Sequence, residues 1–365
     1  MTISAGSYLG DYEVLELIGR GAMGTVYRGY HKALDRVVAI KVLDALASDL
    51  HGAERFQREA RAIAHLRHPN ILAVFDFGEV SGVPYMVVEY MPGGSLAAAL
   101  AAGPALSTLA VITLLRGVAA GLDHAHAAGV VHRDVKPANV LLSSDRVPVL
   151  GDFGLARLRI DTSLTGTGLI VGSPAYMAPE QAKGLEVGPA ADRYSFAVMA
   201  YQMLTGELPF NADQPLEVLY MHVNSQPFLP SAVRLGLPQA LDTVLLRGLA
   251  KESSERWGSC TALVDRIAES LGSSSIGDIA LTLVLPRPLP SSRTVATPAT
   301  QKIEAVAGNG AASPAGESRV AEASGAMPAG RNLRLMEWVI VVSIAALVAV
   351  LSLLLNHPPT AAGGP

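Results

Sequence analysis

The chain has 365 residues, of which 50% are hydrophobic and only 16% are charged, an apolar balance unusual for a soluble enzyme. With a net charge of −4, it is not a disordered protein, and it lacks the basic excess of nucleic-acid binders. The single cysteine, Cys260, excludes a disulfide framework and a zinc site built from cysteines. Because the net charge is slightly negative, we expect no nucleic-acid partner.

The first motif in the chain is glycine-rich, with Gly19, Gly21 and Gly24 between two apolar runs. Glycines at this spacing let a hairpin fold closely over phosphate groups, which side chains would obstruct. The turn of a dinucleotide-binding βαβ unit shares the spacing, and a hairpin without a ligand is a second alternative. The segment 25–27 continues as a strand rather than opening a helix, which favours a lid over a nucleotide.

A lysine, Lys41, ends the apolar strand predicted over 38–40. Such a lysine is often only a solvated strand end, so its role depends on a partner. The segment 48–67 has helical spacing, and Glu59 lies beside its apolar face. A carboxylate there is costly unless it is paired, so we expect a Lys41–Glu59 ion pair. The alternative is a glutamate that extends to solvent.

The strongest pattern is His132-Arg-Asp134-Val-Lys136-Pro-Ala-Asn139, followed by Asp152-Phe-Gly. Asp134 is suited to orient a hydroxyl group and accept its proton, and Lys136 to steady a phosphate in transfer. Asn139 and Asp152 offer the oxygen ligands that Mg²⁺ prefers. Each residue alone is ordinary, but the combination at these intervals indicates phosphoryl transfer.

The composition changes after residue 270. Between residues 286 and 330, 30 of the 45 residues are Ser, Ala, Gly, Pro or Thr, too few apolar side chains to offset chain entropy. We predict a flexible juxtamembrane linker over 271–334. Within it, the apolar run 279–285 is either a strand or a segment that docks on the preceding domain.

The segment 338–355 contains no charged residue, and as a helix it would measure about 27 Å, close to the hydrocarbon thickness of a bilayer. A buried core helix is the alternative. We predict a single transmembrane helix over 335–355 and a short tail over 356–365. Arg331 and Arg334 precede the helix and the tail has no Lys or Arg, so the positive-inside rule predicts a cell-membrane protein with a cytoplasmic N-terminal domain and an external tail.

Taken together, residues 12–270 resemble the Hanks-type (eukaryotic-like) protein kinases, and most closely their bacterial membrane-anchored serine/threonine members. The resemblance implies an α+β, bilobal protein-kinase fold with a β-rich N-lobe to about Tyr90 and a helical C-lobe, plus a disordered linker and one C-terminal transmembrane helix. It implies ATP as phosphate donor, Mg²⁺ or Mn²⁺ as metal, and Ser or Thr hydroxyls of proteins as acceptors. From the resemblance alone, we also expect a homodimer formed through the N-lobe.

The family pattern assigns roles to individual residues. Asp134 would be the catalytic base, Asn139 and Asp152 the metal ligands, and Lys41 the contact to the α- and β-phosphates. Lys136 marks Ser/Thr rather than Tyr specificity in this family. The residues expected to bind ATP are Ile18, Gly19, Gly21, Gly24, Val26, Ala39, Lys41, Glu59, Glu89, Met91 and Leu141.

A second set of residues matches the part of the family pattern that controls activity. Ala178-Pro-Glu180 resembles the end of an activation segment, and Glu180 is expected to pair with Arg256. Asp192 corresponds to the buried aspartate that supports the catalytic loop, which is here the segment 132–139. The resemblance thus predicts two structural contacts around the active site.

Arg133 lies directly before the expected base. In the family that the chain resembles, an arginine at this position accompanies activation by phosphorylation of the loop between 152 and 180. We expect autophosphorylation at Thr165 and Thr167, because a phosphate there could dock on Arg133. Solvated loop hydroxyls are the alternative. Ser173 stands where the family has the threonine that ties to the catalytic loop.

Three residues depart from the family pattern: Trp257 replaces a common proline, Val149 a frequent lysine, and Gly151 a larger side chain, which would make the floor of the nucleotide site roomier. None removes a catalytic group. A catalytically silent pseudokinase scaffold is the main alternative, but such proteins usually lack one of the groups present here as Lys41, Asp134 and Asp152. The Ala-Pro-Glu segment disfavours a small-molecule phosphotransferase.

Overall fold

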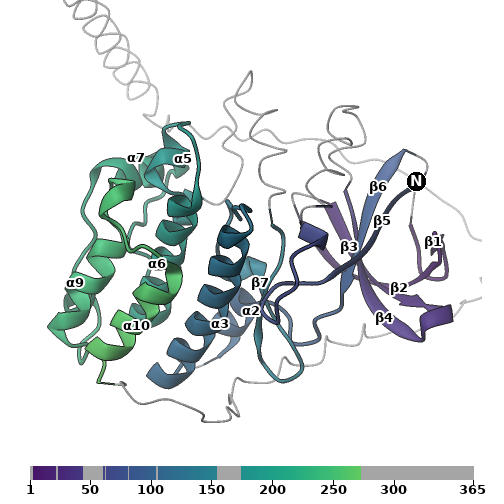
Figure 1. Cartoon of the computed structure of the whole chain (residues 1–365), viewed down its shortest axis with the longest axis horizontal. Coiled ribbons are helices and arrows are strands. Elements are labelled where there is room, and N and C mark those ends of the chain that lie inside the picture. Colours follow the sequence, from purple (N-terminus) through teal and green to yellow (C-terminus); the bar gives the residue numbers. More distant parts are fainter. Residues whose placement is uncertain are drawn as a thin grey trace, which may run out of the picture. The chain divides into compact units, whose positions relative to one another are not determined.

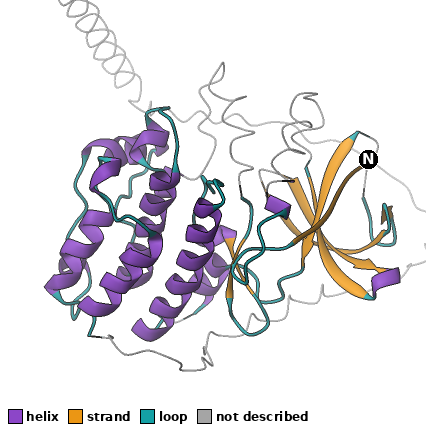
Figure 2. Ribbon diagram, in the orientation of Figure 1, coloured by secondary structure: helices purple, strands orange, loops and turns teal. Residues whose placement is uncertain are grey.

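The computed structural model describes residues 3–21, 24–43, 61, 63–80, 82–103, 106–153 and 174–272. The chain divides into two compact units, 1–295 and 296–365, and all described residues belong to the first. Within that unit a lobe of strands is followed by a lobe of helices (Figures 1 and 2). The expected bilobal arrangement is therefore confirmed. The predicted transmembrane helix, the tail, and the linker beyond residue 272 lie outside the described residues.

The N-lobe is built on a six-stranded antiparallel sheet with the order β1-β2-β3-β4-β6-β5. Its strands are β1 (Tyr8–Leu9), β2 (Tyr12–Gly21), β3 (Gly24–His31), β4 (Arg36–Val42), β5 (Val74–Val80) and β6 (Val83–Glu89), with the short 3₁₀ helix η1 (Lys32–Leu34) between β3 and β4. Its central strand β4, RVVAIKV, is rich in β-branched residues, which suit a pleated, buried surface. Of the helix predicted over 48–67, only Arg61 and residues 63–67 are described.

The register of the sheet places the nucleotide-facing side chains on one face. Val26 pairs with Lys41, and Ala39 pairs with Val88. Because residues directly opposite each other in a sheet point to the same side, these four side chains share a face. The opposite face is covered by a separate apolar cluster that includes Leu9, which comes from the short edge strand β1.

The C-lobe is mainly helical. Its helices are α2 (Leu96–Ala102), α3 (Thr108–Ala127), α5 (Pro179–Ala182), α6 (Pro189–Thr205), α7 (Pro215–Asn224), α8 (Pro230–Val233), α9 (Gln239–Gly248) and α10 (Cys260–Ser270). The 3₁₀ helices η3 (Pro137–Asn139), η4 (Pro174–Tyr176) and η5 (Ser253–Glu255) and the hairpin β7 (Val140–Leu142) and β8 (Pro148–Leu150) complete it. Sequence signals fix several ends: Ser107 caps α3 through the Ala110 N–H, and Gly206, with φ of 89°, ends α6.

Helices α3 and α6 form the centre of the C-lobe core. Among the described residues, α3 is the one helix long and apolar enough to cross a membrane. The apolar side chains of α3 are explained by its position in the core, because α3 packs against α6, α10 and β8 inside the C-lobe.

The β7–β8 hairpin joins the two lobes and positions the functional loops on either side of it. The Leu72 N–H donates to the Leu150 carbonyl at 2.8 Å, and the Leu150 N–H donates to the Asn70 carbonyl at 2.9 Å. On the other strand, the Leu142 N–H donates to the Gly94 carbonyl at 2.9 Å. The hairpin is thus fixed to the segment before β5 and to the segment after β6.

Candidate active site

A cavity of about 450 Å³ lies between the two lobes. Its walls come from the β-sheet, the segment after β6, and the β7–β8 region. The lining residues are Ile18, Gly19, Val26, Ala39, Lys41, Leu72, Val88, Glu89, Tyr90, Met91, Pro92, Gly94, Ser95, Ala138, Asn139, Leu141, Gly151 and Asp152. The predicted residues Ile18, Gly19, Val26, Ala39, Lys41, Glu89, Met91 and Leu141 are all among them.

The sequence-based prediction did not include the lining residues Leu72, Pro92, Gly94, Ser95 and Ala138. Leu72 reaches the cavity because its backbone is bonded to Leu150, a residue 78 positions later. Such a contact leaves no local pattern in the sequence. Pro92, Gly94 and Ser95 lie within four residues of the predicted contact Met91, so extending the predicted segment after residue 91 could have included them.

Gly21 and Gly24 face each other across the β2–β3 hairpin and are not among the lining residues. Gly24 has φ of 139°, and a Cβ atom there would lie 1.9 Å from the Val42 carbonyl oxygen. Glycine is therefore required at position 24 by the close approach of β4. The packing of the sheet is a sufficient reason for this glycine, whether or not a phosphate lies beneath it.

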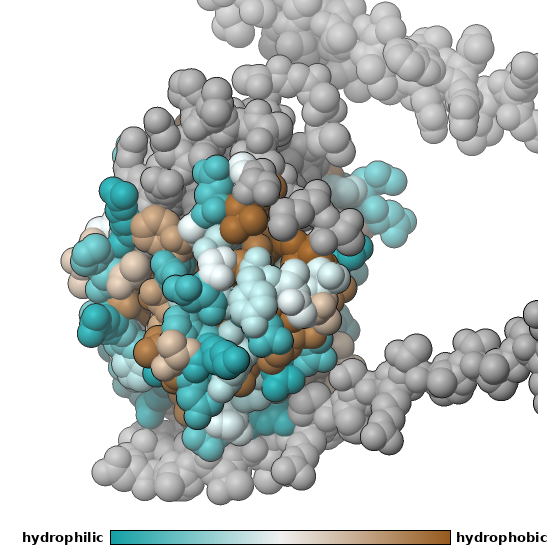
Figure 3. All heavy atoms as spheres, turned by 90° about the vertical axis from the view of Figure 1, so that its right-hand side faces the viewer, coloured by the Kyte–Doolittle hydropathy of each residue, from teal (hydrophilic) through white to brown (hydrophobic). Residues whose placement is uncertain are grey.

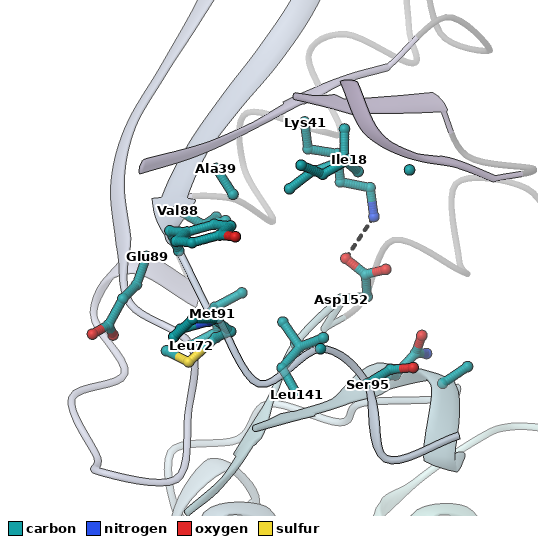
Figure 4. Close-up of a pocket in the computed structure, with 18 residues that line it drawn as sticks. Ile18, Ala39, Lys41, Leu72, Val88, Glu89, Met91, Ser95, Leu141 and Asp152 are labelled. Carbon is teal, nitrogen blue, oxygen red and sulfur yellow. Dashed lines mark hydrogen bonds and ion pairs between the residues drawn. The ribbon is translucent and has the colours of Figure 1, made fainter. Parts of the chain in front are cut away.

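Lys41 and Asp152 form an ion pair across the cavity, with Nζ 2.5 Å from Oδ1. Figure 4 shows the two side chains pointing toward each other, while Glu89 and Met91 lie at the other end of the cavity. Lys41 is 7% exposed, and a buried ammonium group needs such a partner. The expected partner Glu59 lies outside the described residues, so its pairing with Lys41 stays a prediction.

The catalytic loop brings Asp134, Lys136 and Asn139 together. Lys136 Nζ lies 2.7 Å from Asp134 Oδ2, and Asn139 Nδ2 donates to the same oxygen at 2.9 Å and to the Asp134 carbonyl at 2.8 Å. The contacts with the Asp134 side chain involve Oδ2 of its carboxylate. Its Oδ1 takes part in none of them and could accept a hydrogen bond from a substrate hydroxyl group. The contacts also use the Asn139 NH₂ group, so its amide oxygen remains as an acceptor.

His132 connects this loop to the segment that carries Asp152. Its ring is fully buried and packs against Phe153, with ring centroids 4.4 Å apart. The Asp134 N–H donates to His132 Nδ1 at 3.3 Å, which assigns the ring proton to Nε2, 2.9 Å from the Gly151 carbonyl oxygen. A neutral histidine with both nitrogens bonded therefore sets the spacing between Asp134 and Asp152.

The Asp192 carboxylate supports the catalytic loop by binding its backbone, which is the contact that the family pattern implies. Its carboxylate, 1% exposed, accepts hydrogen bonds from the backbone N–H groups of His132 and Arg133, both at 2.7 Å. His126 Nε2 lies 2.7 Å from the same carboxylate. Arg133 has φ of 68°, an uncommon conformation for a residue with a side chain, and the two backbone bonds help to hold it.

Glu180 and Arg256 form a two-pronged ion pair, at 2.6 and 2.8 Å. The guanidinium group also donates to the carbonyls of Ala190, Ala250 and Lys251. Burial raises the pKa of Glu180, but the hydrogen bonds and charge of Arg256, a backbone hydrogen bond and the charge of Lys183 together outweigh burial and lower that pKa below its ordinary value. The pair joins the segment around α5 to the turn before α10.

Gln181, the residue after Glu180, was not predicted from the sequence. Its Oε1 accepts a hydrogen bond from the Ala178 N–H at 3.1 Å, and its Nε2 donates to the Arg133 carbonyl at 2.9 Å. The side chain thus connects the Ala-Pro-Glu segment directly to the residue before Asp134. Its partner is 48 positions away, and no spacing rule reports such a contact.

The segment η4 is held to the C-lobe by α6 and α7. His222 Nε2 lies 3.1 Å from the Ala175 carbonyl, and His222 Nδ1 lies 2.9 Å from the Tyr194 hydroxyl. Ser195 Oγ donates to the Tyr176 carbonyl at 2.7 Å. Burial and the nearby Lys251 lower the pKa of His222 to about 4, so the ring is neutral at pH 7. Thr165, Thr167 and Ser173, predicted in the preceding loop, lie outside the described residues.

A sequence profile described as "Protein kinase domain" matches residues 12–266, and the chain belongs to that family. The chain is 41% identical over 278 residues to the serine/threonine-protein kinase PksC of Streptomyces coelicolor, covering 72% of this chain and 50% of the relative. It is 40% identical over 256 residues to the serine/threonine-protein kinase PknE of Mycobacterium tuberculosis, covering 70% and 45%.

Among solved structures, the PknI kinase domain of Mycobacterium tuberculosis matches with a TM-score of 0.61 and 35% identity, covering 74% of this chain and all of that one. These comparisons confirm the resemblance to bacterial Hanks-type kinases and the serine/threonine class of the kinase domain. The chain spans about half the length of PksC and PknE.

Proposed function

We propose that this protein transfers the γ-phosphate of ATP to Ser or Thr hydroxyl groups of other proteins. The observation that carries the proposal is the meeting of the Asp134–Lys136–Asn139 cluster with the Lys41–Asp152 pair beside one cavity. The cavity has apolar walls suited to a purine ring and a charged end suited to phosphates. Phosphoryl transfer needs little beyond positioning and charge stabilisation, and these residues supply both.

The residues at the charged end fit a nucleotide-bound Mg²⁺ or Mn²⁺ ion. Asn139 presents its amide oxygen because its NH₂ group is already bonded to Asp134, and Asp152 has a second carboxylate oxygen beyond the one that contacts Lys41. A magnesium ion usually takes one or two protein oxygens and completes its shell with phosphates and water. When bound, the ion would neutralise charge on the transferring phosphate.

The protein's own groups perform the remaining tasks. Asp134 Oδ1 would hold the acceptor hydroxyl and take its proton, while Oδ2 is held by Lys136 and Asn139. Lys136, with its ammonium group beside Asp134, would contact the phosphate in transfer. Lys41 would hold the α- and β-phosphates at the other side.

The proposal is tested with the full chain, purified in detergent, and ATP labelled at the γ-phosphate. Wild type is expected to label a degenerate peptide mixture, with the label on phosphoserine and phosphothreonine alone. Lys41→Met is expected to lose most of this activity. Equal labelling by both proteins, or label on phosphotyrosine, would contradict the assignment.

Autophosphorylation at Thr165 and Thr167 is a further part of the proposal. It is supported by Arg133, whose backbone is held beside the catalytic base by Asp192 and Gln181. A phosphate on Thr165 or Thr167 would add about −1.5 to −2 charge, which the Arg133 guanidinium group could bind. Phosphopeptide mapping after incubation with ATP is expected to find at least one of the two sites occupied. Two unmodified threonines in an active preparation would overturn this part.

We also propose that the kinase domain works on the cytoplasmic face of the cell membrane. The uncharged segment 338–355 and the arginines before it support this placement. Wild type is expected to stay in the membrane fraction after alkaline carbonate extraction, and a chain lacking residues 335–355 is expected to be released. A wild-type chain that is extracted by carbonate would contradict membrane anchoring.

A homodimer formed through the N-lobe completes the proposal. Figure 3 looks onto the side of the molecule that carries the sheet and shows apolar side chains between hydrophilic ones. Leu34 is 68% exposed, and Phe75, on the edge strand β5, is 40% exposed. Sedimentation of the full chain in detergent is expected to show a dimer that Leu34→Asp weakens. A monomer at all concentrations would contradict it.

A further inference from the structure

Arg28, on β3, makes two side-chain contacts that have no part in the reaction proposed above. Its guanidinium group forms an ion pair with Glu16 on β2, with Nη1 2.8 Å from Oε1. Its Cζ atom lies 5.5 Å from the centre of the Tyr90 ring, a distance at which a guanidinium group is attracted to the face of an aromatic ring. Tyr90 directly follows β6 and lines the cavity between the lobes. Arg28 therefore connects β2 to a wall of the nucleotide cavity.

The register of the sheet explains how Arg28 reaches this wall. Arg28 is directly opposite Glu16 on β2 and Ala39 on β4, and residues in such pairs point to the same face. Ala39 is in turn opposite Val88 on β6, and both of these residues line the cavity. Because Ala39 has a short side chain, Arg28 can extend across β4 to Tyr90, two positions after Val88.

The guanidinium group of Arg28 lies against the sheet at one edge. Its Nε atom is buried and has no hydrogen-bond partner among the described residues. The group is thus placed by the Glu16 carboxylate on one side and the Tyr90 ring on the other. Two partners on different strands and segments restrict the side chain more than either would alone.

The part of β2 that covers the cavity has few other supports. β1 reaches only the first two residues of β2, so among the described strands the stretch after Glu16 pairs with β3 alone. This stretch carries Ile18 and Gly19, which line the cavity. The contacts from Glu16 through Arg28 to Tyr90 therefore connect this edge of the sheet to the opposite wall of the cavity.

We infer that Arg28 is a positioning residue for the nucleotide: it holds the β2–β3 hairpin against Tyr90, so that the hairpin closes over the purine ring. The inference rests on the proposed function for the identity of the ligand. Arg28 is not among the lining residues of the cavity, so it acts on the nucleotide through β2 and Tyr90. Its loss weakens binding of the adenosine part of ATP and leaves the transfer step at Asp134 unchanged.

The test uses the full chain in detergent, with the Kd of adenosine and of ATP with Mg²⁺ measured by calorimetry and the transfer reaction by steady-state kinetics. Arg28→Met keeps an unbranched side chain but removes both contacts. It is expected to raise both Kd values about fivefold, a change of about 1 kcal/mol, because partly exposed ion pairs and cation–π contacts are individually weak. The KM for ATP is expected to rise with them, while kcat stays at the wild-type value.

A second variant, Glu16→Gln, removes the ion pair and leaves the contact with Tyr90. It is expected to raise both Kd values less than Arg28→Met does. In a chain that already carries Arg28→Met it is expected to have no further effect, because Glu16 acts through Arg28 and the two changes are then not additive. Additive effects of the two substitutions would overturn the connection.

The matched control is Arg36→Met, because Arg36 on β4 makes a similar contact with the Phe75 ring, at 4.7 Å, and does not line the cavity. It is expected to keep both wild-type Kd values, and an equal loss in this variant would overturn the inference.

The two ligands separate positioning from a simple charge effect. An unchanged Kd for adenosine in Arg28→Met overturns the inference, even if the Kd for ATP rises, because a loss confined to ATP means that the arginine acts on the phosphates. A matching loss for both ligands supports the inference even if wild type transfers no phosphate, a result that contradicts the proposed function alone. Wild type that binds neither ligand contradicts both.

Discussion

Asp192 Oδ1 lies 2.7 Å from the backbone nitrogen of Arg133, the residue immediately before the proposed base. The contact connects the buried start of α6 to the floor of the active site. Since Arg133 adopts a positive φ of 68°, the loop depends on acceptors from outside itself. The position of Asp134 is therefore set as much by the C-lobe core as by its own loop.

Asp192→Asn is expected to impair this support. The amide has one acceptor oxygen, so one of the two backbone N–H groups at His132 and Arg133 would face an NH₂ group instead. An unsatisfied buried donor costs about 1–3 kcal/mol, and we expect a loss of this size in the free energy of unfolding with a larger than tenfold loss in kcat. Urea unfolding and steady-state kinetics measure both. Asp265→Asn, at an exposed position of α10, is the control; equal effects in the two variants would contradict the role of Asp192.

Gln181→Glu is expected to lower kcat by roughly tenfold, the effect of about 1.4 kcal/mol in the transition state. The new carboxylate keeps the acceptor for the Ala178 N–H but places negative charge against the Arg133 carbonyl. The KM for ATP should change little, because Gln181 does not line the nucleotide cavity. Gln239→Glu, at the exposed start of α9, is the matched control. A Gln181→Glu enzyme with wild-type kcat would rule out this connection.

The Glu180–Arg256 pair predicts a pH-dependent contribution to stability. Despite burial, which raises it, the pKa of Glu180 is lowered from 4.5 by the hydrogen bonds and charge of Arg256 together with a backbone hydrogen bond and Lys183, so the unfolded chain binds the proton first as pH falls. The stabilisation is complete above pH 4.5 and is lost as pH falls through the lower, folded-state pKa. Glu180→Gln should destabilise the protein at pH 7 and less below pH 4. Unfolding curves against pH test this, and Glu269→Gln, in an exposed pair, should show little effect at either pH.

His222 predicts a second pH dependence. Its pKa falls from 6.5 to about 4 through burial and the neighbouring Lys251. The unfolded chain therefore binds a proton at this residue between pH 6.5 and 4 while the folded protein does not, so stability declines as pH falls through that window. His222→Gln retains a donor for the Ala175 carbonyl and should show a shallower decline. Urea midpoints from pH 7.5 to 5 measure it; identical slopes in wild type and variant would contradict the argument.

The residues expected to carry the chemistry could be named from the sequence, whereas most of the contacts that position them could not. Asp134, Lys136 and Asn139 lie within six residues, so their chemical types and spacing carry the information locally. Gln181 and His222 act on backbone groups 48 and 47 positions away, and their role depends on how α5 and α7 pack. Local spacing cannot encode such contacts.

Gly24 shows the opposite case, in which a correct motif has more than one physical reason. The spacing of the three glycines predicted a phosphate-binding lid, but the approach of the Val42 carbonyl already excludes a side chain at this position. The pairing of Glu180 with Arg256 was predicted through the family pattern, although no periodicity in the sequence connects two residues 76 positions apart. Resemblance supplied the long-range contact that local physical reasoning could not.

The most direct test of the proposed function compares nucleotide binding with phosphoryl transfer in Asp134→Asn. The substitution keeps the size of the side chain and lies outside the cavity lining, so the Kd for ATP with Mg²⁺ should stay within about threefold of wild type, under about 0.7 kcal/mol. Removing the base should lower the transfer rate by about 10²–10⁴-fold. A variant that binds ATP and transfers phosphate at the wild-type rate would contradict the account.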